Sequence, residues 1–218
     1  MKENGLSGKK LVKSGEWITK EKNNNSKNTL KIFEILNKAN FKYIAKFKDI
    51  DKNKYSYEFV DGETLEKVIC MPLHSIIHII DIIKNMHNLY RNSENQVIVH
   101  GDLSPVNVVF EKDHKIMKII DWDGSYFGDE YEDIAYVCWL WVNFGDEKKE
   151  HDKYIENLVK VFKHLNYKVG EVKKIKETIL NRIEKDQKNS RNNEVFEWYE
   201  YIKLWIVNNW GVIEDEFN

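Results

Sequence analysis

Residues 97–123 read VIVHGDLSPVNVVFEKDHKIMKIIDWD, and this stretch decides the expected fold. Short apolar runs that favour β-strands cover 97–99, 106–110 and 116–120. Four polar residues lie between these runs or directly after them: His100, Asp102, Asn107 and Asp121. Because strand ends and tight loops hold polar side chains in position for a ligand, we expect a functional site here. Two carboxylates and a carboxamide are oxygen ligands of the kind that Mg²⁺ prefers.

The composition indicates a folded globular protein, since 42% of the 218 residues are hydrophobic and 13% are aromatic. Charge is distributed unevenly along the chain. Residues 1–65 carry 14 Lys against 9 acidic residues, whereas residues 66–218 carry 20 Lys or Arg against 27 acidic residues. A basic first part suits phosphates and an acidic second part suits a cationic substrate, although two solvated faces of different sign explain the same numbers.

The cysteine pattern and the hydropathy predict a cytoplasmic protein. Cys70 and Cys138 are far apart and lack the spacing of metal ligands, which favours a reducing compartment. The first ten residues have no apolar signal region, and the most apolar run, 76–83, is too short to span a bilayer. We therefore expect neither a membrane nor a nucleic-acid partner, while the oligomeric state stays open.

The hydrophobic pattern predicts a small sheet with one helix, followed by a larger, mainly helical part. Strands are expected at 10–13, 17–22, 43–47 and 55–60, with a helix at 26–39. A Ser14-Gly15 turn joins the first two strands, and Asp61-Gly62-Glu63 interrupts the pattern. Beyond residues 97–123, helices are expected at 72–91, 129–143, 148–165, 172–183 and 194–209.

Read with its spacing, the central stretch is His100-x-Asp102-x₄-Asn107-x₁₃-Asp121. Its segments VHGDLSPVNVVF and IIDWD resemble the aminoglycoside phosphotransferase/choline kinase family, the small-molecule branch of the protein-kinase-like fold. The resemblance implies an α+β fold of two lobes. Residues 1–61 would form a reduced nucleotide-binding N-lobe, and residues 62–218 a helical C-lobe that carries catalysis and substrate binding.

The resemblance also assigns roles to these residues, and phosphoryl transfer accounts for them chemically. Such transfer depends on positioning and charge neutralisation. Asp102 would orient the acceptor hydroxyl and take its proton, while Asn107 and Asp121 would hold Mg²⁺. His100 belongs to the same catalytic segment, where we expect it to brace the loop. The alternative is a packed histidine with turn-forming aspartates.

The N-lobe departs from the family pattern, because only two strands and one tight turn are expected before the helix. Aligning WITK with the family's third strand places Lys20 at the phosphates, with Lys22 as the alternative. Glu34 is a weak candidate for the glutamate that pairs with this lysine. Glu58 and Val60 fall at the expected hinge, where backbone groups would contact the purine of ATP or GTP.

Two further features favour a small substrate over a protein substrate. Gly101 stands where many protein kinases carry the arginine that reads a phosphorylated loop. Only 12 positions separate Asp121 from Asp133, which leaves little chain for docking a peptide. Asp133 itself is expected to hydrogen-bond the catalytic loop.

The sequence thus predicts Mg²⁺-dependent transfer of the nucleotide γ-phosphate to a hydroxyl of a small molecule. Cationic metabolites and antibiotics are among the candidate acceptors. The alternative is a nucleotide-binding module of the pseudokinase type with little turnover.

Overall fold

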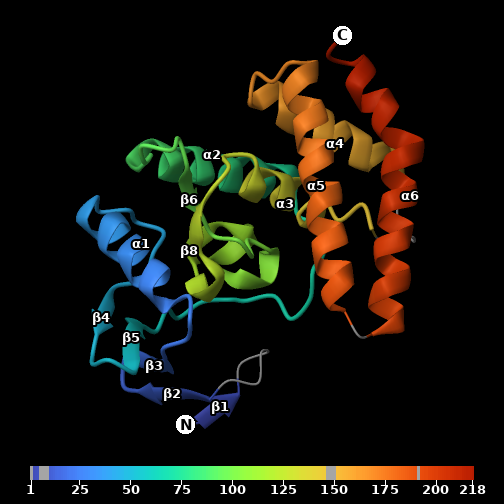
Figure 1. Cartoon of the computed structure of the whole chain (residues 1–218). Helices are drawn as coiled ribbons and strands as arrows, with labels where there is room; N and C mark the ends of the chain where they lie inside the picture. The colour runs from blue at the N-terminus through green and yellow to red at the C-terminus, as the bar shows by residue number, and fades with distance from the viewer. Residues whose placement is uncertain (1, 5–9, 146–150, 191) are drawn as a thin grey trace.

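The computed structural model describes residues 2–4, 10–145, 151–190 and 192–218 (Figure 1). A small part rich in strands lies beside a larger, mainly helical part, as the α+β fold class requires. The small part contains one helix, α1 (Ser26–Lys38), and a five-stranded sheet with the order β1-β2-β3-β5-β4. Its strands are β1 (Lys2–Asn4), β2 (Lys10–Ser14), β3 (Trp17–Glu21), β4 (Phe47–Asp49) and β5 (Lys54–Glu58).

The hairpin expected around Ser14-Gly15 is confirmed, since β2 and β3 pair antiparallel and Gly15 has a φ of +59°. Only two strands were expected before the helix, and this is wrong: β1 pairs antiparallel with β2. The sequence of β1, KEN, is short and has no apolar residue, so it carries no strand signal. Residues 5–9, between β1 and β2, lie outside the described residues.

The strand expected at 43–47 is also wrong, because β4 begins only at Phe47. Ile44 and Ala45 are buried in the core instead of alternating between two faces of a sheet. The backbone oxygen of Tyr43 accepts a hydrogen bond of 2.8 Å from Ile119 N, so this segment joins the small part to the larger one.

The larger part contains two short antiparallel strand pairs and five helices among the described residues. The pairs are β6 (Val97–Val99) with β9 (Tyr126–Gly128), and β7 (Val108–Phe110) with β8 (Ile116–Ile119). The helices are α2 (Leu73–Leu89), α3 (Glu132–Leu140), α4 (His151–His164), α5 (Val169–Asn189) and α6 (Asn193–Asp215). Helices α5 and α6 lie side by side and extend beyond their expected ends (Figure 1).

Two details of this part differ from expectation. Strand β9 was not expected, because its residues YFG follow directly after a turn and have no apolar alternation. Residues 106 and 107 form a 3₁₀ turn, Pro105–Asn107, where a strand was expected. The start of the helix expected at 148–165 falls partly on residues 148–150, which lie outside the described residues.

Helix α2 is the centre of the larger part. Its residues Ile76, Ile79, Ile80 and Ile83 are fully buried, which explains why the helix is apolar on more than one face. In the part of the chain that the structure describes, no helix has the length and apolar character needed to cross a membrane.

His87, near the end of α2, is a buried histidine with only 6% of its surface exposed. Its Nε2 atom has no hydrogen-bond partner among the described residues. Burial lowers the pKa of His87 from 6.5 to about 4, because the charged imidazolium would lose its hydration. The folded protein therefore holds this side chain neutral.

Replacing His87 with Leu should reduce the acid sensitivity of the fold. Between pH 6.5 and about 4 the unfolded chain binds a proton at His87 and the folded chain does not, so the free energy of unfolding decreases as the pH falls. The expected contribution is about 3 kcal/mol. Urea unfolding at several pH values should show a shallower decrease for His87→Leu. His74→Gln, on the exposed side of α2, should retain the wild-type slope; equal slopes for both variants would contradict the assignment.

Candidate active site

The loop that follows β6 is held by a buried carboxylate. The backbone N–H groups of His100 and Gly101 donate to the two carboxylate oxygens of Asp133, at 2.7 and 3.0 Å. Asp133 lies in the first turn of α3 and is 1% exposed. The expectation that Asp133 hydrogen-bonds this loop is confirmed. Burial raises the pKa of Asp133, while the electrostatic interaction with His100 and the hydrogen bonds from the two N–H groups oppose that rise.

Gly101 has a backbone conformation that suits only glycine. Its φ is +79°, and a Cβ atom would lie 2.9 Å from the carbonyl oxygen of Gly124 and 3.0 Å from the Tyr126 ring. An arginine at this position, as in many protein kinases, would clash with this turn. The presence of glycine rather than arginine at position 101 therefore has a steric reason.

His100 is completely buried and both of its ring nitrogens are engaged. Nε2 lies 2.9 Å from the backbone oxygen of Ile120, and Nδ1 accepts a hydrogen bond of 3.3 Å from Asp102 N. The ring packs edge-on against Trp122, with centroids 4.7 Å apart. This geometry fits a side chain that braces the loop against the end of β8.

The carboxylate of Asp102 is oriented from two sides. Its Oδ1 accepts a hydrogen bond of 2.9 Å from the Tyr136 hydroxyl, and its Oδ2 accepts one of 2.9 Å from Asn107 Nδ2. Asn107 Nδ2 also donates to the backbone oxygen of Asp102 at 2.8 Å. The amide nitrogen of Asn107 is thus used within the loop, which leaves its Oδ1 for another ligand. Burial, together with Asp102, raises the pKa of Tyr136, so its hydroxyl stays a donor.

Asp121 follows β8 in a left-handed conformation, with φ 58° and ψ 57°. Asn107 and Asp121 are neighbours in space, because Ile120 N donates to the backbone oxygen of Asn107 at 2.9 Å. Non-glycine residues in this conformation are uncommon and often belong to functional sites.

Lys20 extends from β3 toward the segment after β8 that contains Asp121 and Asp123. Its Nζ lies 2.8 Å from Asp121 Oδ1 and 3.3 Å from Asp123 Oδ2. Burial alone would lower the pKa of Lys20, but Tyr57 and the two aspartates raise it above its usual value. The hydroxyl of Tyr55 donates to the other oxygen of Asp123. Asp123 was not expected in the site, although its spacing from Asp121 within IDWD was a usable signal.

The alternatives to Lys20 and its partners lie elsewhere. Lys22 forms an ion pair of 2.6 Å with Asp49, away from the loop. Glu34 is exposed on α1 and has no ion pair with a described residue. The start of α1 is tied to the loop differently: Asn25 Nδ2 donates to the backbone oxygens of Asp123 and Ser125, at 2.8 and 2.9 Å.

The expected hinge follows β5. The backbone N–H of Glu58 donates to Lys46 O at 2.8 Å, and that of Phe59 donates to Glu16 O at 2.6 Å. Val60 makes no backbone hydrogen bond with another described residue, so its N–H and C=O are available. The space enclosed between Lys20, Tyr57 and the end of β8 is only about 10 Å³, so a nucleotide there needs these side chains or the two lobes to move apart.

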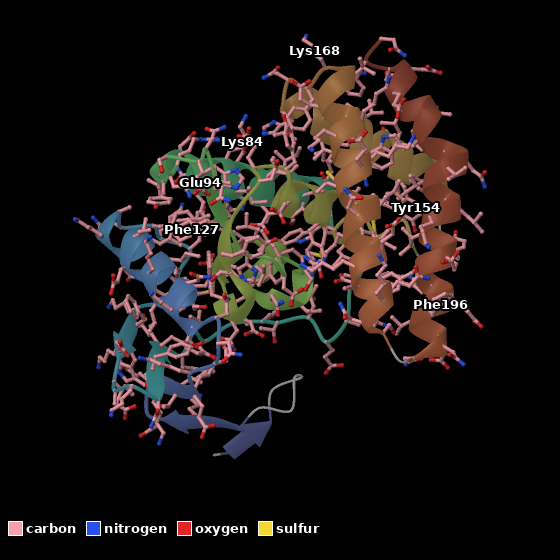
Figure 2. All side chains as sticks on the ribbon, in the orientation of Figure 1. Lys84, Glu94, Phe127, Tyr154, Lys168 and Phe196 are labelled. Atoms are coloured by element: carbon pink, nitrogen blue, oxygen red, sulfur yellow. The ribbon has the colours of Figure 1, made fainter. Side chains whose placement is uncertain are left out.

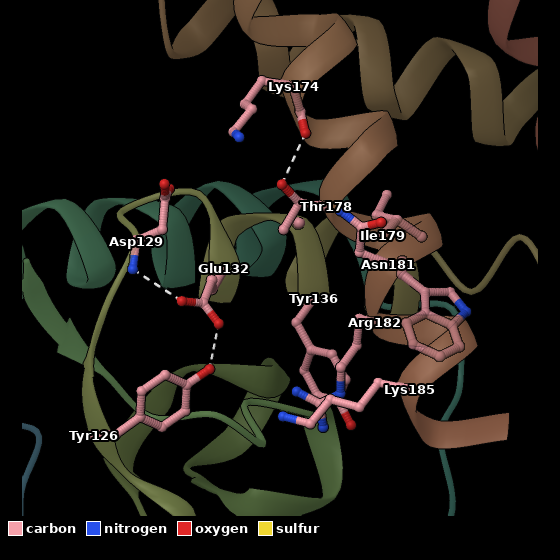
Figure 3. Close-up of a pocket in the computed structure, with 12 residues that line it drawn as sticks. Tyr126, Asp129, Glu132, Tyr136, Lys174, Thr178, Ile179, Asn181, Arg182 and Lys185 are labelled. Atoms are coloured by element: carbon pink, nitrogen blue, oxygen red, sulfur yellow. Dashed lines mark hydrogen bonds between the residues drawn. The ribbon is translucent and has the colours of Figure 1, made fainter. Parts of the chain in front are cut away.

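A cavity of about 260 Å³ lies between α3 and α5 (Figure 3), and Asp102 itself is not among the residues that line it. Tyr136 lines it and donates to Asp102, and Arg182 lines it and donates to Gly101 O at 2.8 Å. The Arg182 guanidinium also stacks 4.5 Å above the centre of the Tyr136 ring. The sequence did not reveal this cavity, because its walls come from segments about 50 residues apart.

Replacing Asp133 with Asn should loosen the catalytic loop. An amide offers one acceptor oxygen where the carboxylate offers two, so one of the two backbone N–H groups loses its buried partner. The free energy of unfolding should fall by about 1–3 kcal/mol. Urea unfolding measures this loss. Asp129→Asn, at an exposed position nearby, should change it by less than about 0.5 kcal/mol, and equal losses in both variants would refute a special role for Asp133.

Comparisons with known proteins place this geometry in context. Residues 55–155, just under half of the chain, match the model of the phosphotransferase enzyme family. No curated protein matches the chain significantly. The matched segment contains the loop after β6, Asn107, Asp121 and Asp133.

Solved structures share the fold at low identity. An aminoglycoside phosphotransferase from Alicyclobacillus acidocaldarius is 9% identical, with a TM-score of 0.63 over 97% of this chain and 87% of that chain. Aminoglycoside 2'-phosphotransferase-IIIa is 11% identical, with a TM-score of 0.62 over 92% and 90%. The choline kinase LicA from Streptococcus pneumoniae is 14% identical, with a TM-score of 0.56 over 99% and 92%.

These neighbours show that the chain has the protein-kinase-like fold of small-molecule kinases. The resemblance of this chain to the phosphotransferase enzyme family, expected from residues 97–123, is thereby confirmed.

Proposed function

We propose that this protein transfers the γ-phosphate of ATP or GTP to a hydroxyl of a small molecule, with Mg²⁺ as the metal. The observation that carries the proposal is the juxtaposition of Asp102, Asn107 and Asp121 around one braced loop, with Lys20 directed at the same place. Such transfer needs little covalent chemistry from the protein, and these residues supply positioning and charge.

Asp102 acts as the base for the acceptor. Two of its lone pairs accept hydrogen bonds from Tyr136 and Asn107, which fix the carboxylate and leave its other lone pairs for the acceptor hydroxyl. The acceptor oxygen bonds to the γ-phosphorus as the bond from phosphorus to the bridging oxygen breaks. The hydroxyl proton passes to Asp102.

Asn107 and Asp121 fit Mg²⁺ as ligands. Both offer hard oxygen atoms, Asn107 through the Oδ1 that its own hydrogen bonds leave open, and Mg²⁺ commonly takes one or two protein ligands beside phosphates and water. When bound, the metal neutralises charge on the phosphates. Asp123, beside Asp121, is a further candidate carboxylate.

Lys20 and the hinge form the nucleotide side of the site. Lys20 is charged, buried and directed at the loop that would hold the metal, and Val60 has free backbone groups for the purine beside Glu58. One fold neighbour was solved with GDP, and an aminoglycoside phosphotransferase from Streptomyces rimosus with ADP and streptomycin. On this proposal residues 1–61 bind the nucleotide, and residues 62–218 hold the catalytic loop and the acceptor.

Cys70 and Cys138 are far apart in the sequence and lack the spacing of metal ligands, which fits a reducing compartment. We therefore place the reaction in the cytoplasm. The alternative function is a nucleotide-binding module of the pseudokinase type. The narrow space beside Lys20 and Tyr57 favours it, whereas the ordered set of Asp102, Asn107 and Asp121 favours turnover.

Replacing Asp102 with Asn should abolish most of the transfer. Since the amide cannot take the hydroxyl proton, kcat should fall by about 10²–10⁴-fold while nucleotide binding changes little. Mg²⁺-dependent transfer to a panel of hydroxylated small molecules is the measurement. Asp113→Asn, in an exposed turn, is the matched control. Tight nucleotide binding without transfer by the wild type would favour the pseudokinase alternative.

Replacing Lys20 with Met should weaken nucleotide binding by about 10–100-fold, because a charge-assisted hydrogen bond to phosphate is lost. Lys22→Met removes a lysine from the same strand, one that pairs with Asp49, and should bind as the wild type does. Titration of both variants with Mg²⁺-ATP and Mg²⁺-GTP gives the dissociation constants. Equal weakening by both substitutions would overturn the assignment to Lys20.

A further inference from the structure

The cavity beside Asp102 has a cationic wall formed by one face of α5. Residues spaced three or four apart project from this helix toward the cavity: Lys174, Thr178, Asn181, Arg182 and Lys185 (Figure 3). In the view with all side chains, α5 lies between the core and α6 (Figure 2). The helix was expected to end at residue 183, so Lys185 was not associated with this face.

The acidic groups of the opposite wall are largely engaged with the protein itself. Glu132 accepts hydrogen bonds through both oxygens, from Asp129 N at 2.8 Å and from the Tyr126 hydroxyl. One oxygen of Asp129 accepts from Tyr131 N at 2.9 Å. These hydrogen bonds hold the two carboxylates in the turn between β9 and α3, where each keeps its negative charge.

The cations of the α5 wall differ from one another in whether another residue of the protein binds them. Arg182 forms an ion pair of 2.7 Å with Asp186 and donates to Gly101 O, so it is part of the fold. The amines of Lys174 and Lys185 form no ion pair or hydrogen bond with any described residue. The lining of the cavity therefore carries three cationic side chains against the carboxylates of Asp129 and Glu132, although the C-lobe as a whole carries an excess of acidic residues.

We propose that the acceptor is an anionic alcohol, whose carboxylate or phosphate group is bound by Lys174 or Lys185 while its hydroxyl extends past Tyr136 to Asp102. This inference rests on the proposed function and specifies its acceptor. Lys174 and Lys185 are 11 residues apart on α5, about 16 Å along the helix, so a small anion gains a charge-assisted contact with one of these amines. A cation is repelled by that amine. The acceptor is then opposite in charge to the cationic compounds that the composition suggested.

The test compares hydroxylated acceptors in matched sets of three, in which the same carbon skeleton ends in a carboxylate, a carboxamide or an amine. A phosphate ester of the same skeleton distinguishes the two kinds of anion. The proteins are the full chain, the double variant Lys174→Glu/Lys185→Glu and the control Lys173→Glu. Lys173 is exposed on α5 next to Lys174 but does not line the cavity. Transfer rates and direct binding by calorimetry are both measured.

We expect kcat/KM and affinity to be at least about tenfold higher for the anionic member than for the amide and the amine. The double variant should lose this preference, and Lys173→Glu should keep it. Preference for the amine, or equal binding of all three members, would overturn the inference while leaving the proposed function intact. If no acceptor is phosphorylated, the proposed function fails, and calorimetry still decides whether Lys174 and Lys185 bind an anion.

Discussion

The contact on which the site depends is the pair of hydrogen bonds from His100 N and Gly101 N to Asp133. It fixes a turn in which Gly101 adopts a left-handed conformation, and Arg182 binds the carbonyl on the other side of the same residue. Helices α3 and α5 therefore hold Gly101 from both sides, one through its N–H and the other through its C=O. Because Asp102 directly follows this unit, its carboxylate is positioned before any ligand arrives, which is the main contribution of a scaffold to catalysis.

A second constraint joins the two lobes at residues 121–125. Lys20 and Tyr55 of the sheet reach the side chains of Asp121 and Asp123, and Asn25 at the start of α1 binds backbone oxygens of the same segment. A partly buried ion pair of this kind adds little net stability, since Lys20 loses most of its hydration while 42% of the Asp121 side chain stays exposed. The effect of the ion pair is on position. Because Lys20 contacts Asp121, movement of the N-lobe also affects the position of the Asp121 carboxylate, so nucleotide entry and metal binding would be coupled. The chain achieves this without a glutamate of α1.

Net charge along the chain and charge within a cavity are separate quantities. The acidic excess of residues 66–218 lies on many surfaces, and several of its carboxylates are bound by backbone N–H groups or by Tyr126. Lys174 and Lys185 are few, but the helical repeat of α5 brings them to one face beside Asp102. Recognition depends on the groups that remain uncompensated where the ligand binds.

The sequence by itself determined the fold class, the hairpin at Ser14-Gly15, and the group of residues from His100 to Asp121, because these signals are local spacings within a few strands and turns. The brace from Asp133 was also predictable from its motif. Tertiary structure alone decided that β1 pairs with β2 and β9 with β6, that Asp123 and Tyr55 join Lys20, and that α5 forms a wall of the cavity. Those features depend on which segments meet in space, and such a contact leaves no periodicity in the sequence that could reveal it.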